Sequence, residues 1–357
     1  MIPVTKPYLP KKEKVFKLLD GVWARNWLTN NGPLVQEFER RLKSHLKLEN
    51  LVYVNNGTMA LQLAIKALDL KGEIITTPFS YVATTSSIVW EGCKPVFVDI
   101  DKQTLNIDPN KIEKSITDKT SAILATHCFG NACDINAIDN IAKKHNLKVI
   151  YDAAHCFNTL YKGVSVFGFG DISITSLHAT KLMHSVEGGI VFSENLNVLK
   201  RLNYMRNFGH DGFENFNGVG INGKNSEFHS AMGLCVLEDI DQISSKRKQQ
   251  SEFYDELFAG LNIEKQKMQE KCSYNHAYYP VLFSNEKVLL RVKKALEDNM
   301  ISPRRYFYPS LSSLDYVTKT ATPISDSCAS RILCLPLYHE LTLEQQKLIS
   351  RIIISVV

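Results

Sequence analysis

The sequence predicts an α/β protein with a mostly parallel sheet, helices on both faces of that sheet, and a smaller second domain. Between residues 51 and 193, short apolar runs alternate with stretches of helical periodicity, and strands that alternate with helices form such sheets. With 357 residues, 44% of them hydrophobic, the chain can bury one large core and a smaller one. Ligands of such proteins bind beyond the carboxyl ends of the strands, so we look for the chemistry there.

Each element follows from the local pattern. The strand candidates are short apolar runs at residues 51–54, 73–76, 95–100, 121–126, 148–152 and 171–175. Apolar residues at helical spacing predict helices over 58–68 and 135–145 and one long helix over 235–259. Beyond that helix the strand signals are fewer and less regular. We therefore expect an N-terminal segment (1–35), a large domain (36–235) and a small C-terminal domain (236–357).

Composition excludes several classes of protein. The net charge of +5 is mild and basic residues are scattered among acidic ones, whereas nucleic-acid binders concentrate theirs. The eight cysteines form no CxxC pair, which favours reduced thiols in the cytosol. The N-terminus lacks the apolar region of a signal peptide, and no apolar run approaches the ~20 residues of a membrane span. We therefore expect a soluble, cytoplasmic protein.

Two motifs that follow predicted strands could bind charged groups. In NNGT (55–58), the glycine lets backbone amides approach an anion, and the following helix adds its dipole. The simpler alternative is a plain helix cap, a role open to Thr58. In YDAAH (151–155), Asp152 directly follows a strand and needs a helix N-terminus, a metal or a protonated ring nitrogen as partner, unless it only caps the next segment. His155 faces the same pocket if a helical turn follows.

Two further motifs lie at the same predicted edge of the sheet. Tyr81 in PFSYVAT (78–84) could cover a flat ligand, or it could be a core aromatic residue. Lys181 in SLHATKLMHSVEGG (176–189) lies between a β-branched run and a glycine pair. Most lysines are surface residues. This one follows the predicted strand that comes next after the strand ending at Asp152. A reactive amine is the alternative that this position favours.

A metal site in the last motif is improbable, because His178, His184 and Glu187 lack HExxH spacing. The four motifs instead combine a phosphate cradle, a carboxylate, an aromatic plate and a lysine. Pyridoxal 5′-phosphate needs this set, since its aldehyde requires a Schiff-base lysine, its pyridinium nitrogen an acidic partner and its phosphate a helix N-terminus. The sequence therefore predicts pyridoxal phosphate as cofactor, and no metal.

A family resemblance extends over almost the whole chain. It is carried by the segments WLTNNGPLVQEFE, NNGTMALQLAIKAL, GEIITTPFSYVATTSSIVWEGCKPVFVDID, YDAAH, SLHATKLMHSVEGG, RNFGHDG and GINGKNSEFHSAMGL. The chain resembles the DegT-type sugar-nucleotide aminotransferases, pyridoxal-phosphate enzymes of fold type I, for which S-x-H-x-x-K followed by E-G-G is specific. Within the family it is most similar to the dTDP-4-amino-4,6-dideoxyglucose transaminases. The resemblance implies a large domain with a mostly parallel seven-stranded sheet and a smaller α/β C-terminal domain.

The resemblance also implies a role for each residue that matches the family motifs. Lys181 would form the Schiff base and transfer protons, Asp152 would pair with the pyridine nitrogen, and Tyr81 would stack on the ring. His155 takes a position, often Gln in relatives, beside the phenolic oxygen of the cofactor. The cofactor-binding set is Gly57, Thr58, Tyr81, Asp152, His155, Ser176 and Lys181.

Two other positions receive roles by the same resemblance. Lys224 stands where the family places an Asn or Arg that reaches the cofactor phosphate of the neighbouring subunit. Tyr306 falls where some relatives have a sugar-contacting His. The resemblance assigns no role to His184 and Glu187, which are expected to line the sugar side of the pocket. These expectations include a homodimer with shared active sites.

The activity that the resemblance implies is transamination of a nucleotide-linked keto-sugar with L-glutamate as amino donor. The expected reaction converts dTDP-4-keto-6-deoxy-D-glucose into dTDP-4-amino-4,6-dideoxy-D-glucose for O-antigen and lipopolysaccharide biosynthesis. Relatives that act as dehydratases carry histidine at the Schiff-base position, whereas Lys181 is retained here, which favours full transamination.

Three alternatives remain at this point. The chain could aminate C3 instead of C4 or act on another nucleotide sugar, although His155 in YDAAH favours C4. It could be a non-catalytic ligand sensor of the same fold, because fold does not dictate function. A structural or nucleic-acid-binding α/β protein is the least favoured, since it would leave all four strand-end motifs as coincidence.

Overall fold

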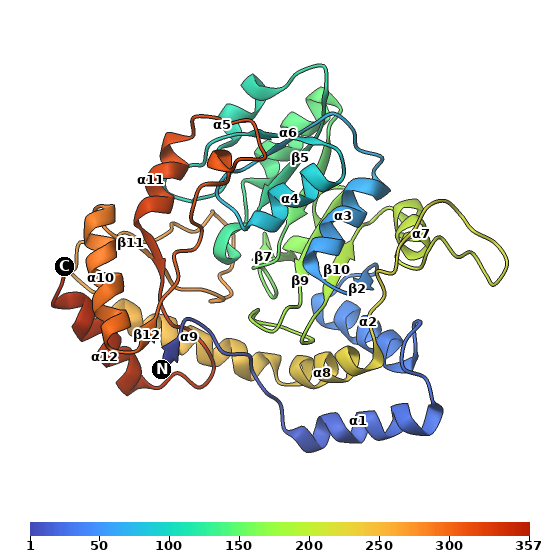
Figure 1. Ribbon diagram of the computed structural model, residues 1–357, viewed down its shortest axis with the longest axis horizontal. Coiled ribbons are helices and arrows are strands. Elements are labelled where there is room, and N and C mark those ends of the chain that lie inside the picture. The colour runs from blue at the N-terminus through green and yellow to red at the C-terminus, as the bar shows by residue number, and fades with distance from the viewer.

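A computed structural model describes residues 1–357, and a seven-stranded sheet forms its centre (Figure 1). The strand order is β2-β10-β9-β6-β5-β3-β4. The strands are β2 (Val52–Val54), β3 (Glu73–Thr76), β4 (Lys94–Phe97), β5 (Thr120–Thr126), β6 (Lys148–Asp152), β9 (Ile172–Ser176) and β10 (Gly189–Phe192). Only β10 runs antiparallel to its neighbours. This confirms the predicted mostly parallel sheet and the α/β fold.

Alternate residues of the central strands β3 and β5 enter two separate hydrophobic clusters, one on each face of the sheet. Ile74 and Leu124 lie in the cluster that includes side chains of α3 and α7, whereas Ile75 and Ile123 lie in the cluster that includes those of α2, α6 and α8. Burial on both faces is the hallmark of a parallel sheet. The helices of this part of the chain are α1 (Lys12–Arg25), α2 (Pro33–Leu46), α3 (Gly57–Ala67), α4 (Val82–Trp90), α5 (Pro109–Ile112), α6 (Ile135–His145), α7 (Leu196–Met205) and α8 (Glu227–Glu238).

The single long helix expected over 235–259 is wrong, because the chain forms two helices, α8 and α9 (Ile240–Leu257). They meet at Asp239, whose amide bonds to the carbonyl of Val236, three residues back. The Asp239 carboxylate accepts a hydrogen bond from the Tyr8 hydroxyl at 3.0 Å and lies 3.5 Å from the Lys14 ammonium. These contacts come from the N-terminal segment, which no local helical pattern reveals.

The C-terminal part has a hydrophobic cluster of its own, formed mainly by α9, α10, α12 and the strands between them. Its elements are α10 (Glu286–Asp298), α11 (Pro323–Arg331), α12 (Leu343–Ile354), β11 (Pro280–Leu282), β12 (Ile301–Ser302) and β13 (Ile332–Cys334). The first strand, β1 (Ile2–Pro3), pairs with β12, so the N-terminus lies in this part (Figure 1). The hairpin β7 (Leu160–Tyr161) and β8 (Val164–Ser165) completes the strands. The exact domain boundaries stay a prediction.

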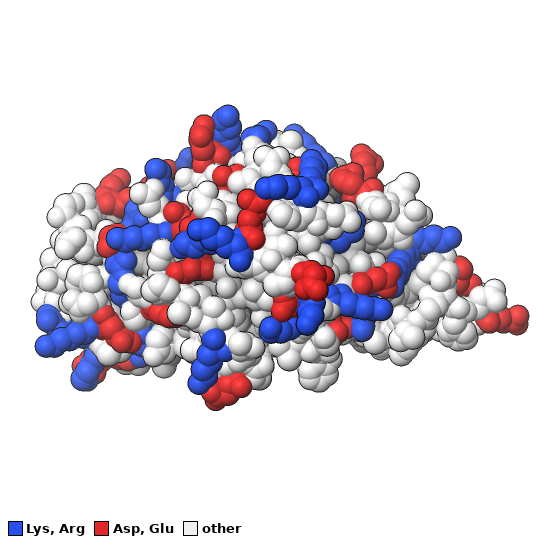
Figure 2. All heavy atoms as spheres, turned by 90° about the horizontal axis from the view of Figure 1, so that it is seen from above, with Lys and Arg blue, Asp and Glu red and all other residues white.

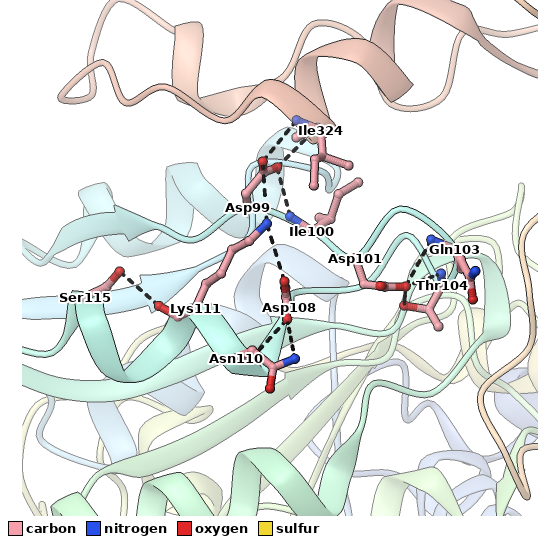
Figure 3. A network of polar contacts seen from close by, with 11 residues as sticks. Asp99, Ile100, Asp101, Gln103, Thr104, Asp108, Asn110, Lys111, Ser115 and Ile324 are labelled. Atoms are coloured by element: carbon pink, nitrogen blue, oxygen red, sulfur yellow. Dashed lines mark hydrogen bonds and ion pairs between the residues drawn. The ribbon is translucent and has the colours of Figure 1, made fainter.

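A buried aspartate connects the two parts of the molecule (Figure 3). Asp99 follows β4, and its two carboxylate oxygens accept hydrogen bonds from the amides of Ile324 at 3.0 Å and Ser325 at 2.9 Å. These amides open α11, and the first amides of a helix have no partner within it. Asp99 therefore caps a helix that begins more than two hundred residues later, and it fixes the segment that precedes α11.

The surface carries both signs of charge side by side (Figure 2). On the face shown, Lys and Arg alternate with Asp and Glu, and neither sign forms an extended field. None of the helices combines the length and the apolar character that a membrane span requires.

Candidate active site

A cavity of about 230 Å³ opens at the carboxyl ends of β6 and β9. Nine of the eleven residues singled out from the sequence line it, namely Gly57, Thr58, Tyr81, Asp152, His155, Ser176, Lys181, Glu187 and Tyr306. Ser80, Thr126, His178, Thr180, Arg304 and Phe307 also contribute to its wall. Side chains from distant parts of the chain therefore meet where a sheet of this class binds its ligands.

One end of the cavity is built to bind an anion. Helix α3 starts at Gly57, and a Cβ at this position would lie 2.9 Å from the Cβ of Ser176, so only glycine permits this approach. The amides of Gly57 and Thr58 are among the unpartnered first donors of the helix, and the helix dipole also favours an anion. The cap is Asn56, whose Oδ1 accepts from the amide of Met59 at 2.8 Å, rather than Thr58. That leaves Thr58 available to a ligand.

The carboxylate of Asp152 lies buried at the end of β6, with 5% of the residue exposed. Its Oδ2 accepts a hydrogen bond from the Thr84 hydroxyl at 2.7 Å, and its Oδ1 accepts one from the amide of Ala154 at 3.2 Å. Burial raises the pKa of Asp152, and these hydrogen bonds and the nearby Lys181 only partly oppose the shift. A buried carboxylate is stabilised most by a cation, so this site favours a positively charged ligand atom.

A chain of hydroxyl groups behind Asp152 was not apparent from the sequence. The Thr84 hydroxyl contacts that of Ser80 at 2.7 Å, which in turn contacts that of Thr126 at 2.9 Å. The only sequence signal is the spacing of Ser80 and Thr84 around the first turn of α4 in PFSYVAT. Because Thr84 donates to Asp152, its oxygen is left to accept from the Ser80 hydroxyl.

His155 presents a neutral imidazole with a defined tautomer. Its Nδ1 accepts a hydrogen bond from the amide of Phe129 at 3.2 Å, so the ring proton resides on Nε2. Burial lowers the pKa of His155 well below its usual value, and the ring lies parallel to that of Phe307, within 7° at a centroid distance of 5.6 Å. A ring of this kind can donate one hydrogen bond from Nε2 to a ligand oxygen.

Lys181 lies in the loop between β9 and β10, and this loop is closed by backbone hydrogen bonds. The amide of Leu177 donates to the carbonyl of Gly188, and that of Ala179 donates to Val186, both at 2.7 Å. The Lys181 amine itself donates to the hydroxyl of Tyr278 at 3.1 Å. Sequence reasoning missed Tyr278 because it precedes β11 in a segment without regular structure and belongs to no motif.

The remaining wall of the cavity combines aromatic and charged side chains. The ring of Tyr81 stacks on that of Tyr306 within 18°, with centroids 6.2 Å apart. The guanidinium of Arg304 lies 4.4 Å from the centroid of the Tyr306 ring. Glu187 forms an ion pair with His178 at 3.5 Å when that ring is protonated. This side offers flat surfaces and hydrogen-bonding groups to a second ligand.

His184 and Lys224 do not line the cavity. His184 is 1% exposed, donates from Nε2 to the carbonyl of Tyr8 at 2.8 Å and accepts at Nδ1 from the amide of Val186. Both ring nitrogens of His184 already form hydrogen bonds within the protein. The structure therefore does not support the expected contact of His184 with the sugar. The Lys224 amine lies 4.7 Å from the centroid of the Phe208 ring, and burial lowers its pKa.

These features fit pyridoxal 5′-phosphate without adjustment. The glycine-lined helix N-terminus suits its phosphate, the buried Asp152 carboxylate suits its protonated ring nitrogen, and the Nε2 donor of His155 suits its phenolic oxygen. Lys181 lines the same cavity as these groups. The fold and the site together define an enzyme that uses pyridoxal phosphate.

Comparison with known proteins identifies the family. The chain belongs to the DegT/DnrJ/EryC1/StrS aminotransferase family, whose model matches residues 10–353. It is an aminotransferase, and pyridoxal phosphate is its cofactor. It is 41% identical to a dTDP-4-amino-4,6-dideoxy-D-glucose transaminase of Shigella dysenteriae, with 95% of this chain and 94% of the relative covered. It is 31% identical to a GDP-perosamine synthase of Vibrio cholerae, with 97% and 96% covered.

Solved structures agree with this assignment. The crystal structure of DesI in the presence of its TDP-sugar product superposes with a TM-score of 0.93 at 29% identity, covering 98% of this chain and 91% of that one. The PMP form of Spr1654 from Streptococcus pneumoniae, at 22% identity, has a TM-score of 0.91 and supports the fold.

Proposed function

We propose that the enzyme transfers the amino group of L-glutamate to a nucleotide-linked keto-sugar. The proposed substrate is dTDP-4-keto-6-deoxy-D-glucose, and the product is dTDP-4-amino-4,6-dideoxy-D-glucose. Two relatives of that name, at 41% and 38% identity over nearly the full length of both chains, support this choice. The observation that carries it is the presence of Lys181, Asp152 and an anion-binding helix N-terminus around one cavity.

Each side chain of the site has a separate role in the proposed reaction. When bound, pyridoxal phosphate serves as an electron sink that stabilises negative charge on the carbon undergoing amino transfer. Asp152 keeps the ring nitrogen protonated, and the α3 N-terminus with Ser176 anchors the phosphate. Lys181 moves a proton to and from the substrate carbon, because it is the amine that lines the cavity. His155 donates to the phenolic oxygen from Nε2.

The cavity accommodates only part of the proposed ligands. At about 230 Å³ it is smaller than the roughly 300–1,000 Å³ of sites that enclose a drug-sized ligand. We therefore expect the nucleotide to extend out of the cavity, near Tyr81, which is 47% exposed. We assign the sugar to the wall formed by Tyr306 and Glu187, which line the cavity together with Arg304 and His178.

Specificity for C4 is the finer part of the proposal. A dTDP-3-amino-3,6-dideoxy-alpha-D-galactopyranose transaminase of Aneurinibacillus thermoaerophilus is 33% identical over 68% of this chain. Two other relatives are named GDP-perosamine synthase, a name that specifies a different nucleotide. C3 amination or another nucleotide is thus the second candidate. His155, in place of the Gln frequent among relatives, favours C4 in our proposal.

A panel of keto-sugar nucleotides tests the proposal. We expect the purified enzyme to convert glutamate to 2-oxoglutarate and to aminate the dTDP-4-keto-6-deoxy-glucose substrate at least about tenfold better than 3-keto or GDP-linked analogues, in line with one or two polar contacts. NMR of the product identifies the carbon that carries nitrogen. Nitrogen on C3 contradicts the regiochemistry, and absence of 2-oxoglutarate formation contradicts the activity itself and supports a sensor.

We also propose a homodimer in which each subunit completes the other's site. The loop between α7 and α8 protrudes from the body (Figure 1), and the matching end of Figure 2 is mostly uncharged. Phe213, Phe216 and Val219 in this loop are 102%, 64% and 89% exposed, which is costly for a free monomer. Lys224 lies in the same loop and outside its own chain's cavity, as a residue that serves a partner would.

Mixed subunits test this arrangement. The Lys181→Ala and Lys224→Ala variants should each be impaired, and a dimer formed from one subunit of each contains one complete site. We expect mixing after dissociation to recover glutamate turnover that neither variant shows alone, and sedimentation to give a dimer. Two Lys181→Ala subunits provide the control. No recovery on mixing contradicts the role of Lys224 across subunits.

The proposed product indicates the kind of biosynthetic pathway in which the enzyme acts. An amino-deoxy sugar nucleotide is a donor for glycan assembly, and we assign the enzyme to O-antigen or related surface polysaccharide biosynthesis. A relative at 30% identity carries the name spore coat polysaccharide biosynthesis protein SpsC. All eight cysteines are free thiols, which suits the reducing cytoplasm.

A further inference from the structure

Tyr278 is the residue that contacts the Lys181 amine. Its hydroxyl oxygen lies 3.1 Å from Nζ, and Nζ lies 5.8 Å from the centre of the Tyr278 ring. The two residues come from separate parts of the chain, the loop between β9 and β10 and the segment between α9 and β11. The amine is thus held by a side chain that belongs to neither the phosphate end nor the ring-nitrogen end of the cavity.

The Tyr278 ring is fixed by neighbours that also shape the site. Its centroid lies 4.4 Å from that of His155, 5.8 Å from that of Phe129 and 5.8 Å from that of Tyr306. Such aromatic contacts restrict a ring to one position. A shift of Tyr278 would therefore disturb the residues on both sides of it.

The backbone around Tyr278 is equally constrained. Asn275 donates from Nδ2 to the carbonyls of His155 at 2.7 Å and Phe157 at 2.9 Å. Arg247 of α9, 4% exposed, donates from Nη1 to the carbonyl of Ala277 at 2.9 Å. These bonds tie the segment to the loop after β6 on one side and to α9 on the other. The Tyr278 hydroxyl is therefore a fixed point beside the Lys181 amine.

The Tyr278 hydroxyl stays protonated. Burial raises the pKa of Tyr278, and the positive charges of Arg247 and Arg304 only partly offset that rise. A neutral hydroxyl can accept a hydrogen bond from an amine or donate one to its lone pair. A carboxylate at this place would instead bind the ammonium form tightly, and an ammonium group cannot accept a proton. A phenol is therefore a suitable resting partner for an amine that must act as a base.

We propose that Tyr278 is a positioning residue that holds the Lys181 amine whenever that amine is free. This inference deepens the proposed function and rests on it. In the uncharged state the amine condenses with the cofactor aldehyde, so that a C=N bond replaces C=O and the oxygen leaves as water. After glutamate displaces it, the amine returns to Tyr278 and from there reaches the substrate carbon. Tyr278 thereby fixes the starting position of both steps.

The Tyr278→Phe variant tests the proposal because it keeps the ring and removes only the hydroxyl. Cofactor-free protein is mixed with pyridoxal 5′-phosphate, and the absorbance of the C=N linkage is followed by stopped flow. We expect covalent capture to be about tenfold to a hundredfold slower than in the unmodified enzyme, the loss that imprecise placement of a reacting group produces. The deuterium isotope effect with 2-deuterated glutamate should rise, since proton transfer then limits the rate.

Two controls separate positioning from damage to the fold. Pyridoxamine 5′-phosphate has no aldehyde and does not bond to Lys181, so its affinity should be the same in the variant. Tyr279→Phe makes the same chemical change one residue away, where the hydroxyl donates to Asp255 at 2.6 Å, and should capture the cofactor at the normal rate. An unchanged capture rate in Tyr278→Phe, or a matching loss of pyridoxamine phosphate affinity, overturns the proposal. Capture needs neither glutamate nor sugar, so a wrong substrate assignment leaves this test intact.

Discussion

Replacing Lys181 by alanine or arginine is expected to lower glutamate turnover by at least about a thousandfold, because covalent attachment and proton transfer are lost together. Alanine provides no amine, and the guanidinium of arginine neither condenses with an aldehyde nor gives up its proton near neutral pH. The measurement is the rate of 2-oxoglutarate formation with saturating pyridoxal phosphate. Borohydride should reduce a chromophore in the unmodified enzyme and none in the Lys181→Ala protein.

A lysine outside the site provides the comparison. Lys162 is exposed on the turn between β7 and β8, and Lys162→Ala should retain full turnover and the reducible chromophore. If the Lys181→Ala protein transaminates at the normal rate, the assignment of the reactive amine is wrong. An inactive Lys162→Ala protein would indicate instead that loss of activity reflects general damage.

The Asp152→Asn variant is expected to bind pyridoxal phosphate at least about a hundredfold more weakly and to lose turnover to a similar extent. Removing one partner of a buried charge pair costs about 3–5 kcal/mol, and an amide keeps the shape of the side chain without its charge. Equilibrium dialysis of the cofactor and steady-state rates measure the two losses. Thr84→Val removes one hydrogen bond to Asp152 but keeps the charge, and should cost only about 1 kcal/mol.

The pH dependence of cofactor affinity should distinguish the same variants. Burial raises the pKa of Asp152 in the protein without cofactor, so the carboxylate becomes protonated at a higher pH than an exposed one. Its attraction for the ring cation is complete above that pKa and is lost as the pH falls through it. We expect the Asp152→Asn protein to lack this fall in affinity on acidification. An identical pH profile in both proteins would show that Asp152 does not pair with the ring nitrogen.

The sequence predicted the sheet and most of the cavity wall because both follow from local pattern. An apolar strand shows where its last residue lies, and parallel strands bring their last residues to one edge, so Asp152, Lys181 and Gly57 could be placed near one another. The mostly parallel sheet and the family are confirmed. The roles of the individual side chains stay predictions that the experiments above address.

Other features depend on contacts that no local pattern reveals. His184 lies three residues from Lys181, yet the irregular loop directs its ring toward the carbonyl of Tyr8. Helix α8 ends at Glu238, and the N-terminal segment binds the carboxylate of the next residue, Asp239. Tyr278 reaches the Lys181 amine from a segment without regular structure. In each case a partner far away in the sequence decides the outcome.

The closed loop that carries Lys181 sets a limit on how the enzyme can work. Its two ends, Ser176 of β9 and Gly189 of β10, pair with each other in the sheet. Backbone hydrogen bonds also join the two sides of the loop, so the main chain cannot carry the amine toward a distant substrate. Only rotation about the bonds of one side chain moves the nitrogen. Under the role proposed for Lys181, every atom that receives or loses a proton must come within reach of this one side chain, and a sugar that binds slightly too far away would go unreacted, however tightly it is held.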